Sequence, residues 1–365
     1  MALARSDIVA SIEDLERFST DLQQLSVGAL WAAAAQRTQK RNSDESVEPC
    51  AQAVGHVWRW KDLRPHALRA AELVGTQQAE RRVLQLRNPG ITDRSATTNT
   101  LFAGIQIVMP GEVARAHRHT MAALRFIIES DGGYTNVNGE PIPMRPGDLV
   151  LTPNWSWHDH ANDTQSPMIW LDGLDAPLVR MLESVFQEEF ADERQPLSVS
   201  RGLTQSKYGT GPLRPAWEEV NVDHSPLMHY PWSTTRQSLV ELGSSVEGSP
   251  TDGILMEYTN PATGGPVMPT MGCFIQMLKP GQRTEAHRHT ASTIYHVVEG
   301  RGYSIVGGRS LDWEKKDVFC VPGWTTHQHV NASSTEPAFL FSFTDAPALK
   351  ALGLFREQPM PGEFG

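Results

Sequence analysis

The sequence predicts a mainly β protein in which two similar units follow one another, preceded by a helical N-terminal extension. Three observations lead to this prediction. At 365 residues the chain is too long for one ordinary domain and suits two of roughly 150 residues plus an extension. The spacing of apolar residues changes after Asn88-Pro89-Gly90 from a helical to a strand pattern. One segment also recurs 170 residues later in the chain.

The N-terminal part alternates apolar and charged positions at helical spacing, as in DLERFSTDLQQL and LRPHALRAAELV. After residue 88 the apolar runs FAGIQIVM, ALRFIIE and DLVLTP are short and are bounded by Gly, Pro and Asn, which is typical of strands. We therefore expect a helical N-terminal extension over 1–87 and strands beyond it.

The repeat sets the remaining boundaries, because GEVARAHRHT at 111–120 returns as GQRTEAHRHT at 281–290. We expect a first, catalytic unit over 88–180, a helical and irregular connection over 181–255, a second unit over 256–350 and a C-terminal tail over 351–365. The matching positions are His117, His119, Pro153, His158, Asn162 and Asp175-Ala-Pro177 in the first unit, and His287, His289, Pro322, His327, Asn331 and Asp345-Ala-Pro347 in the second.

The overall composition excludes several classes of partner. A formal charge of −10 and a pI near 5.7 argue against a nucleic-acid partner. No apolar run approaches the roughly 18 residues that cross a membrane. The first residues carry acids early and show no secretory signal pattern. The three cysteines are odd in number and widely separated, so we expect no disulfide framework and a cytoplasmic protein.

The histidines of the first unit are spaced for metal binding. Side chains two apart in a strand point to the same face, so His117 and His119 project together while Arg118 points away. His158 follows GDLVLTPNWSW, a predicted strand and turn that returns to the same unit. Three neutral imidazoles on one side of an ion leave the opposite coordination positions open. Imidazole suits iron, copper, zinc and nickel, so the histidines alone do not select the metal.

These positions resemble the two paired motifs of the cupin superfamily, whose members form small antiparallel barrels of the double-stranded β-helix, or jelly-roll, type. The residues that carry the resemblance in the first unit are Gly111, His117, His119, Gly147, Pro153, His158 and Asn162. Many cupins have a glutamate ligand soon after the first two histidines. Here Ala123, Leu124 and Arg125 occupy that place, which argues against manganese chemistry of the oxalate decarboxylase kind. The resemblance predicts two cupin barrels in tandem.

Longer stretches resemble the bicupin ring-cleaving dioxygenases of the gentisate 1,2-dioxygenase and salicylate 1,2-dioxygenase group. They include AERRVLQLRNPG, TLFAGIQIVMPGEVARAHRHTMAALRFIIE, GDLVLTPNWSWHDH and MIWLDGLDAPLV. The resemblance implies non-haem Fe(II), O2 as co-substrate, and cleavage between the carboxyl-bearing and hydroxyl-bearing ring carbons. The implied substrate is a small aromatic hydroxy acid: gentisate, salicylate or a 5-substituted salicylate. A homotetramer is also implied.

The same resemblance assigns roles around the metal. An arginine in an otherwise apolar strand suits a substrate carboxylate, because its planar fork forms charge-assisted hydrogen bonds. Arg125 and Arg81 match the family's substrate-binding arginines, and Phe102 and Gly104 match residues that line its pocket. By resemblance His160 binds the substrate or acts as acid or base, and Asp172 orients a neighbouring histidine or arginine.

Met121 is a departure from the family, which commonly has Gln after the HRHT segment. If Met121 faces the far side of the ring, the 5-hydroxyl of gentisate lacks a hydrogen-bond partner, while a softer or apolar substituent is accommodated. Halo- and nitrosalicylates therefore become candidate substrates. Alternatively, Met121 points into packing.

The second unit keeps the ligand spacing in His287, His289 and His327 and could hold a second ion. It has Tyr295 where the first unit has Arg125, and Ser342 where the first has Asp172. We therefore expect one active site per chain. Two other classes stay open from the residues alone: a metal-dependent cupin isomerase or lyase, and a non-catalytic bicupin.

Overall fold

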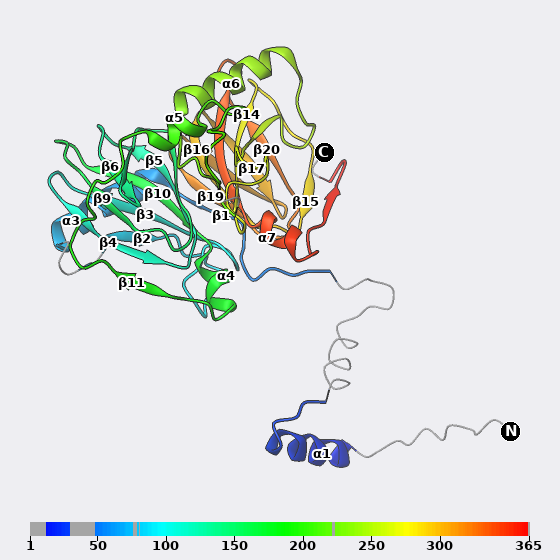
Figure 1. Ribbon diagram of the computed structural model, residues 1–365. Helices are drawn as coiled ribbons and strands as arrows, with labels where there is room; N and C mark the ends of the chain where they lie inside the picture. The colour runs from blue at the N-terminus through cyan, green and yellow to red at the C-terminus, as the bar shows by residue number, and fades with distance from the viewer. Residues whose placement is uncertain (1–11, 30–47, 76–78, 80, 221–222, 364–365) are drawn as a thin grey trace. The chain divides into compact units, whose positions relative to one another are not determined.

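The computed structural model describes residues 12–29, 48–75, 79, 81–220 and 223–363 (Figure 1). The chain divides into two compact units, Met1–Glu48 and Pro49–Gly365. The first unit contributes helix α1 (Ile12–Gln24), within a stretch that the sequence predicts to be helical. The second unit contains two β-barrels, each made of a six-stranded and a five-stranded sheet.

The first barrel combines sheets of strand order β12-β8-β5-β10-β3-β2 and β11-β4-β9-β6-β7. Its strands are β2 (Val83–Gln85), β3 (Phe102–Val108), β4 (Val113–His119), β5 (Ala123–Glu129), β6 (Tyr134–Val137), β7 (Glu140–Pro143), β8 (Leu149–Thr152), β9 (His158–Ala161), β10 (Met168–Leu174), β11 (Gln187–Glu189) and β12 (His229–Tyr230).

The second barrel repeats this plan with the orders β1-β19-β16-β21-β14-β13 and β18-β17-β20-β15-β22. Its strands are β1 (His56–Trp58), β13 (Ile254–Tyr258), β14 (Gly272–Leu278), β15 (His287–His289), β16 (Thr293–Glu299), β17 (Arg301–Val306), β18 (Arg309–Glu314), β19 (Val318–Val321), β20 (His327–Asn331), β21 (Ala338–Thr344) and β22 (Glu357–Pro359). The described helices of Pro49–Gly365, which holds both barrels, are α3 (Trp60–Leu73), α4 (Ala176–Met181), α5 (Leu203–Tyr208), α6 (Trp232–Ser245) and α7 (Ala346–Ala351).

The two barrels exchange short strands. Strand β1, which precedes the first barrel in sequence, pairs with β19 of the second barrel. Strand β12, which precedes the second barrel, pairs with β8 of the first. The structure thus corrects the predicted boundaries: 1–87 is not wholly helical, 181–255 contains β11 and β12, and 351–365 contains β22. Strands of two or three residues are too short to show an alternating pattern and depend on pairing with a distant segment.

A helix follows each exchanged strand and begins at a tryptophan. The backbone N–H of Trp60 donates to Asp317 Oδ1 at 2.7 Å, and that of Trp232 donates to Asp148 Oδ1 at 2.9 Å. Each carboxylate satisfies an N–H group that a helix start leaves without an intrahelical partner. The internal repeat therefore reaches back to the strand and helix at 56–73, further than the histidine motifs indicate.

The two six-stranded sheets pack against one another, and their contact forms one continuous apolar core. Phe126 of β5 stacks on Phe341 of β21 with ring centroids 4.2 Å apart. Gly173 of β10 permits this approach, because a Cβ there would lie 2.8 Å from Phe343 Cζ. Strands β5 and β10 are therefore buried on both faces, toward the second barrel and toward the interior of the first.

Two aspartates of the repeated Asp-Ala-Pro segment join the barrels reciprocally. Asp175 of the first barrel accepts hydrogen bonds from the Ala122 N–H (2.9 Å) and from Thr270 Oγ1 of the second barrel (2.6 Å). Asp345 of the second barrel accepts from the Ser292 N–H at 2.8 Å and from Thr100 Oγ1 of the first barrel. Burial raises the pKa of both carboxyls to about 6.

Among the described helices, none is long and apolar enough to cross a membrane.

The raised pKa values predict a pH-dependent stability. Between about pH 4 and 6 the folded chain binds protons at Asp175 and Asp345 that the unfolded chain has released, so their contribution to stability falls as pH rises. In the Asp175→Asn/Asp345→Asn variant this pH dependence should vanish. In the wild type it amounts to a change in the free energy of unfolding on the order of 3 kcal/mol per carboxyl. Denaturant unfolding from pH 4 to 7 measures it, with exposed Asp312→Asn as the control. Parallel profiles of wild type and double variant would contradict the prediction.

Candidate metal centre

The first histidine triad meets on the inner side of the five-stranded sheet of the first barrel. His117 and His119 end β4, and the register of β4 and β9 places His158 directly opposite His117. The ring centroids are 5.3 Å apart for His117 and His119, 4.6 Å for His117 and His158, and 4.9 Å for His119 and His158. One ligand atom from each residue lies within 4.8 Å of the others, so the three residues form a group that could hold a metal ion.

Backbone carbonyls fix two of these rings. His119 Nδ1 donates to Met121 O at 2.8 Å, and His158 Nδ1 donates to Ser156 O at 3.0 Å. With the proton on Nδ1, each Nε2 keeps its lone pair for a metal. Arg81 Nη2 lies 3.3 Å from Nδ1 of His117 and also donates to Arg115 O at 3.1 Å. The cationic side chain of Arg81 thus lies against the triad.

The surroundings keep all three imidazoles neutral. Burial, with the nearby Arg81, lowers the pKa of His117 to about 2. Burial also lowers the pKa of His119 to about 4 and that of His158 well below its ordinary value. Neutral imidazole is the form that ligates a metal, so no proton competes with the ion at neutral pH. The donor set fits a divalent transition metal and leaves room for further ligands opposite the histidines.

A strained turn delivers the third histidine. Trp155 adopts a positive φ of 60°, which a bulky residue rarely does, and its N–H donates to His119 O at 2.7 Å. The guanidinium of Arg118 lies 4.5 Å from the ring centroids of both Trp155 and Trp157 and pairs with Glu188. Arg118, the outward-facing residue of the HxH motif, therefore stabilises the turn that precedes His158.

A cavity of about 390 Å³ opens beside the triad, large enough for a substituted aromatic acid. It brings together most of the residues that the sequence predicts for the site. Its walls are Arg81, Val83, Gln85, Phe102, Gln106, His117, His119, Met121, Ala123, Arg125, His158, Asp172, Leu174, Arg180 and Gln187.

Arg125 is fully buried in this cavity and retains donor capacity. Its Nη1 donates to Thr152 Oγ1 at 2.5 Å, and its Nε lies 3.6 Å from Asp172 Oδ1 without a hydrogen-bond partner among the described residues. Trp170 Nε1 donates to the same Asp172 oxygen at 2.8 Å. Burial lowers the pKa of Arg125 and raises that of Asp172, and the two opposite charges counteract both shifts. A guanidinium held this way can bind an incoming carboxylate.

His160 and Gly104 do not line the cavity. His160 shares the inward face of β9 with His158, but it lies deeper, with its ring centroid 5.0 Å from that of Trp170 and its Nδ1 2.9 Å from Thr135 Oγ1. The second barrel repeats this arrangement with His329 and Ser304, so it is not specific to the first site. A Cβ on Gly104 would lie 2.5 Å from Val83 Cγ1, so Gly104 serves the close approach of β3 and β2.

Met121 both faces the cavity and packs against other side chains, which were the two alternatives left open by the sequence. It is 8% exposed, lines the cavity and packs in a cluster with Ala176 and Val179, against Phe102 and Leu174. The cavity wall at Met121, Phe102 and Leu174 is therefore apolar.

Four polar residues of the cavity were missed from the sequence: Gln85, Gln106, Arg180 and Gln187. Gln106 could have been found, because it continues the alternation Phe102, Gly104, Gln106 along β3. Its Nε2 is buried without a hydrogen-bond partner in the described part of the chain. Arg180 ends the predicted first unit at a position that Lys350 matches in the second unit, whereas Gln187 lies in the predicted connection.

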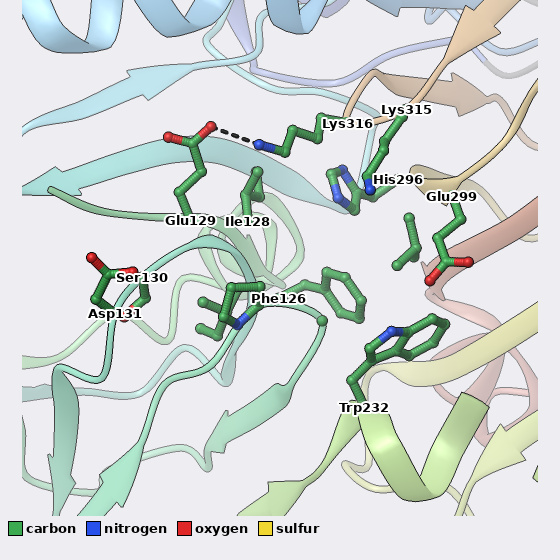
Figure 2. Close-up of a pocket in the computed structure, with 14 residues that line it drawn as sticks. Phe126, Ile128, Glu129, Ser130, Asp131, Trp232, His296, Glu299, Lys315 and Lys316 are labelled. Atoms are coloured by element: carbon green, nitrogen blue, oxygen red, sulfur yellow. Dashed lines mark hydrogen bonds and ion pairs between the residues drawn. The ribbon is translucent and has the colours of Figure 1, made fainter. Parts of the chain in front are cut away.

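A separate cleft of about 440 Å³ lies between the barrels, away from both triads. Figure 2 shows Phe126, Trp232 and His296 around it, with Lys316 reaching Glu129. The Lys316 Nζ to Glu129 Oε1 distance is 2.7 Å. Because this ion pair joins the two barrels, the cleft belongs to their contact.

Comparisons with known proteins agree with this geometry. A family model described as a cupin domain matches residues 104–173 and 274–344. Gentisate 1,2 dioxygenase 1 of Aquipseudomonas alcaligenes is 36% identical over 95% of this chain and 97% of its own length. The 5-aminosalicylate 1,2-dioxygenase of Comamonas sp is 40% identical over 94% of this chain and 91% of its own length. The chain belongs to the gentisate and salicylate 1,2-dioxygenase family.

Solved structures of the family show the same fold. The salicylate 1,2-dioxygenase of Pseudaminobacter salicylatoxidans superposes with a TM-score of 0.86 at 33% identity, covering 96% of this chain and 98% of that one. The predicted family, bicupin fold and class of ring-cleaving dioxygenase are confirmed. None of the relatives reported above supports the alternatives of an isomerase or lyase, or of a non-catalytic bicupin.

The Arg125–Asp172 pair yields a prediction with two separable effects. Arg125→Gln should destabilise the chain by about 3–5 kcal/mol, because Asp172 is left buried without its partner. It should also weaken binding of the aromatic acid about 10- to 100-fold. In Arg125→Gln/Asp172→Asn the stability should recover while the binding stays weak. Denaturant unfolding and KM measure the two effects, and a double variant with normal KM would refute the role of Arg125.

Proposed function

We propose that the chain cleaves the ring of a 2-hydroxybenzoate at an Fe(II) centre held by His117, His119 and His158. The observation that carries the proposal is the charge of the cavity beside the triad. Arg81, Arg125 and Arg180 line it with Asp172 as the one acid among the described wall residues. A divalent ion on three neutral histidines adds further positive charge, so an anionic ligand is favoured there.

The side chains have distinct tasks in this proposal. Arg125 binds the carboxylate of the substrate, and Asp172 holds the guanidinium in place through a contact of 3.6 Å. Arg81 lines the cavity beside His117 and compensates negative charge near the metal. Phe102, Leu174 and Met121 cover the ring and exclude water. Iron(II), when bound, supplies redox chemistry and the open positions at which the acid and O2 meet.

We propose that His160 keeps the neighbouring Thr135 oriented and, as a neutral ring, holds a proton close to the metal site. Its Nε2 is fully buried and has no hydrogen-bond partner among the described residues, while Nδ1 faces the Thr135 hydroxyl. Burial and Arg125 lower its pKa well below the ordinary value, so the ring stays neutral and acts as a hydrogen-bonding group.

The proposed substrate is salicylate or a salicylate with an apolar or soft group at position 5, in preference to gentisate. The apolar wall at Met121 offers no hydrogen bond to a 5-hydroxyl. The relatives are named for different acids: one for gentisate, one for 5-aminosalicylate, and one, of Nocardioides sp. (strain KP7) and 40% identical over 85% of this chain, for 1-hydroxy-2-naphthoate.

Assembly as a homotetramer and a cytoplasmic location are also proposed. Exposed apolar residues at the end of α4, Met181, Leu182, Val185 and Phe186, supply a surface suited to a second copy. Cys50, Cys273 and Cys320 are free thiols, as a reducing compartment would keep them. Light scattering of the purified protein tests the tetramer.

Oxygen uptake by protein loaded anaerobically with Fe(II) tests the function. We expect consumption of O2 with salicylate or 5-substituted salicylates, no measurable turnover in His119→Ala, and normal turnover in the exposed control His66→Ala. His119→Ala fails because two imidazoles hold the ion too weakly. Absence of uptake with every acid of the panel, gentisate included, would refute the proposal.

Substrate choice is tested at one position. Met121→Gln adds a polar partner to the apolar wall, so kcat/KM for gentisate should rise relative to that for 5-chlorosalicylate by about 10-fold, the effect of one hydrogen bond. The ratio is measured for both acids in wild type and variant. An unchanged ratio would show that Met121 does not face the 5-position.

A further inference from the structure

The second barrel carries a complete histidine triad of its own. His287 and His289 lie on β15, and the register of β15 and β20 places His327 opposite His287. One ligand atom of each residue lies within 4.8 Å of the others. The ring centroids of His287 and His327 are 4.3 Å apart, closer than those of their counterparts in the first barrel.

The rings are oriented as ligands. His289 Nδ1 donates to Ala291 O at 2.8 Å and His327 Nδ1 donates to Thr325 O at 2.9 Å, so both Nε2 atoms keep their lone pairs. His327 Nε2 is buried and has no hydrogen-bond partner among the described residues. A buried polar atom without a partner is costly, and an ion at the centre of the triad would satisfy it.

The charge beside this triad is the reverse of that in the first barrel. Two residues before β2 stands Arg81, next to His117; two residues before β13 stands Asp252, whose Oδ1 is 4.0 Å from His287 Nε2. The hydroxyls of Ser249 and Thr251 donate to the other Asp252 oxygen at 2.9 and 2.6 Å. The carboxylate is thereby held with one oxygen toward the triad, where it stabilises a cation and repels an anion.

The shape of the site has also changed. The cavity of the second barrel measures about 150 Å³, against about 390 Å³ in the first. Phe274 occupies the strand position of Gly104 and lines this smaller cavity. Tyr295 stands where Arg125 would bind a carboxylate, and Lys350, the cation of this cavity, shares it with the acids Asp252 and Glu357. The site therefore has less room for an aromatic acid and lacks the buried arginine that would bind its carboxylate.

The strands around the triad are paired through their backbones as in the first barrel. β15 pairs with β20 at His287 and His327, and the preceding Arg283 pairs with Val330. An ion bound by His287, His289 and His327 would link the same two segments a second time, through side chains.

We propose that the second barrel binds a divalent transition-metal ion through His287, His289 and His327, with Asp252 as the charge-balancing carboxylate, and that this ion stabilises the barrel and does not bind the aromatic acid. The site is distinct from the proposed catalytic centre. The difference in charge and cavity size assigns the two triads to different tasks.

Metal content tests the site without reference to turnover. Full-length protein is stripped with a chelator, reloaded with Zn²⁺, freed of excess ion and measured by inductively coupled plasma mass spectrometry. We expect two equivalents per chain in wild type and one each in His119→Ala and His289→Ala. One equivalent in wild type with an unchanged content in His289→Ala would overturn the proposal.

Asp252→Asn keeps the shape of the site, so it serves even if His289→Ala fails to fold. Loss of the carboxylate should make the second-site ion exchange to a chelator about 10-fold faster or more, with exposed Asp312→Asn as the control. The ion should also raise the melting temperature of His119→Ala protein. Equal exchange rates, or no rise in melting temperature, would overturn the roles given to Asp252 and to the ion.

Exclusion of the acid is tested with Co²⁺, whose visible absorption reports on its ligands. In Co²⁺-loaded His289→Ala, where the first site is filled, salicylate should shift the spectrum. In Co²⁺-loaded His119→Ala it should leave the spectrum unchanged. A salicylate-dependent shift in His119→Ala would overturn the exclusion.

Discussion

The contact between the two six-stranded sheets is the constraint on which the metal centre depends. Phe126 faces the second barrel and stacks on Phe341, so its neighbour Arg125 must face the interior of the first barrel. Likewise Gly173 gives room to Phe343, and Asp172 beside it faces the cavity. A slip of one residue would move Arg125 into an apolar contact and Phe126 toward the metal, so the apolar core fixes the register of the polar site.

Strand exchange makes the two barrels interdependent. Each six-stranded sheet is completed by a short strand from the segment that precedes the other barrel, and each following helix starts on an aspartate of the barrel that its strand joins. The reciprocal bonds from Asp175 to Thr270 and from Asp345 to Thr100 add polar links at the same contact. Residues 49–363 therefore form two barrels in topology, and each barrel is completed and held in shape by contacts with segments of the other.

Repetition of one fold has produced two different electrostatic environments around the same three ligands. In the first barrel arginines surround a neutral triad, so the charge of a metal ion there is left for a substrate anion to balance. In the second barrel Asp252 provides that balance from within the protein, and the cavity, which Phe274 lines, is smaller. The three histidines thus determine where a metal can bind, and the residues on neighbouring strands determine which ligands and chemistry the bound metal can support.

The sequence alone determined the repeat, the two triads and the mainly β fold, because HxH spacing and strand alternation express local geometry that does not depend on distant contacts. The resemblance of longer segments indicated the family and pointed to Arg125 and Asp172, which the structure places in the cavity. Only the tertiary structure decided which barrel each short strand completes, that His160 lies behind the cavity, and that Gln106, Arg180 and Asp252 border the two sites. Strands of two or three residues and single polar side chains carry no periodic signal, and their positions are set by pairing with segments far away in the chain.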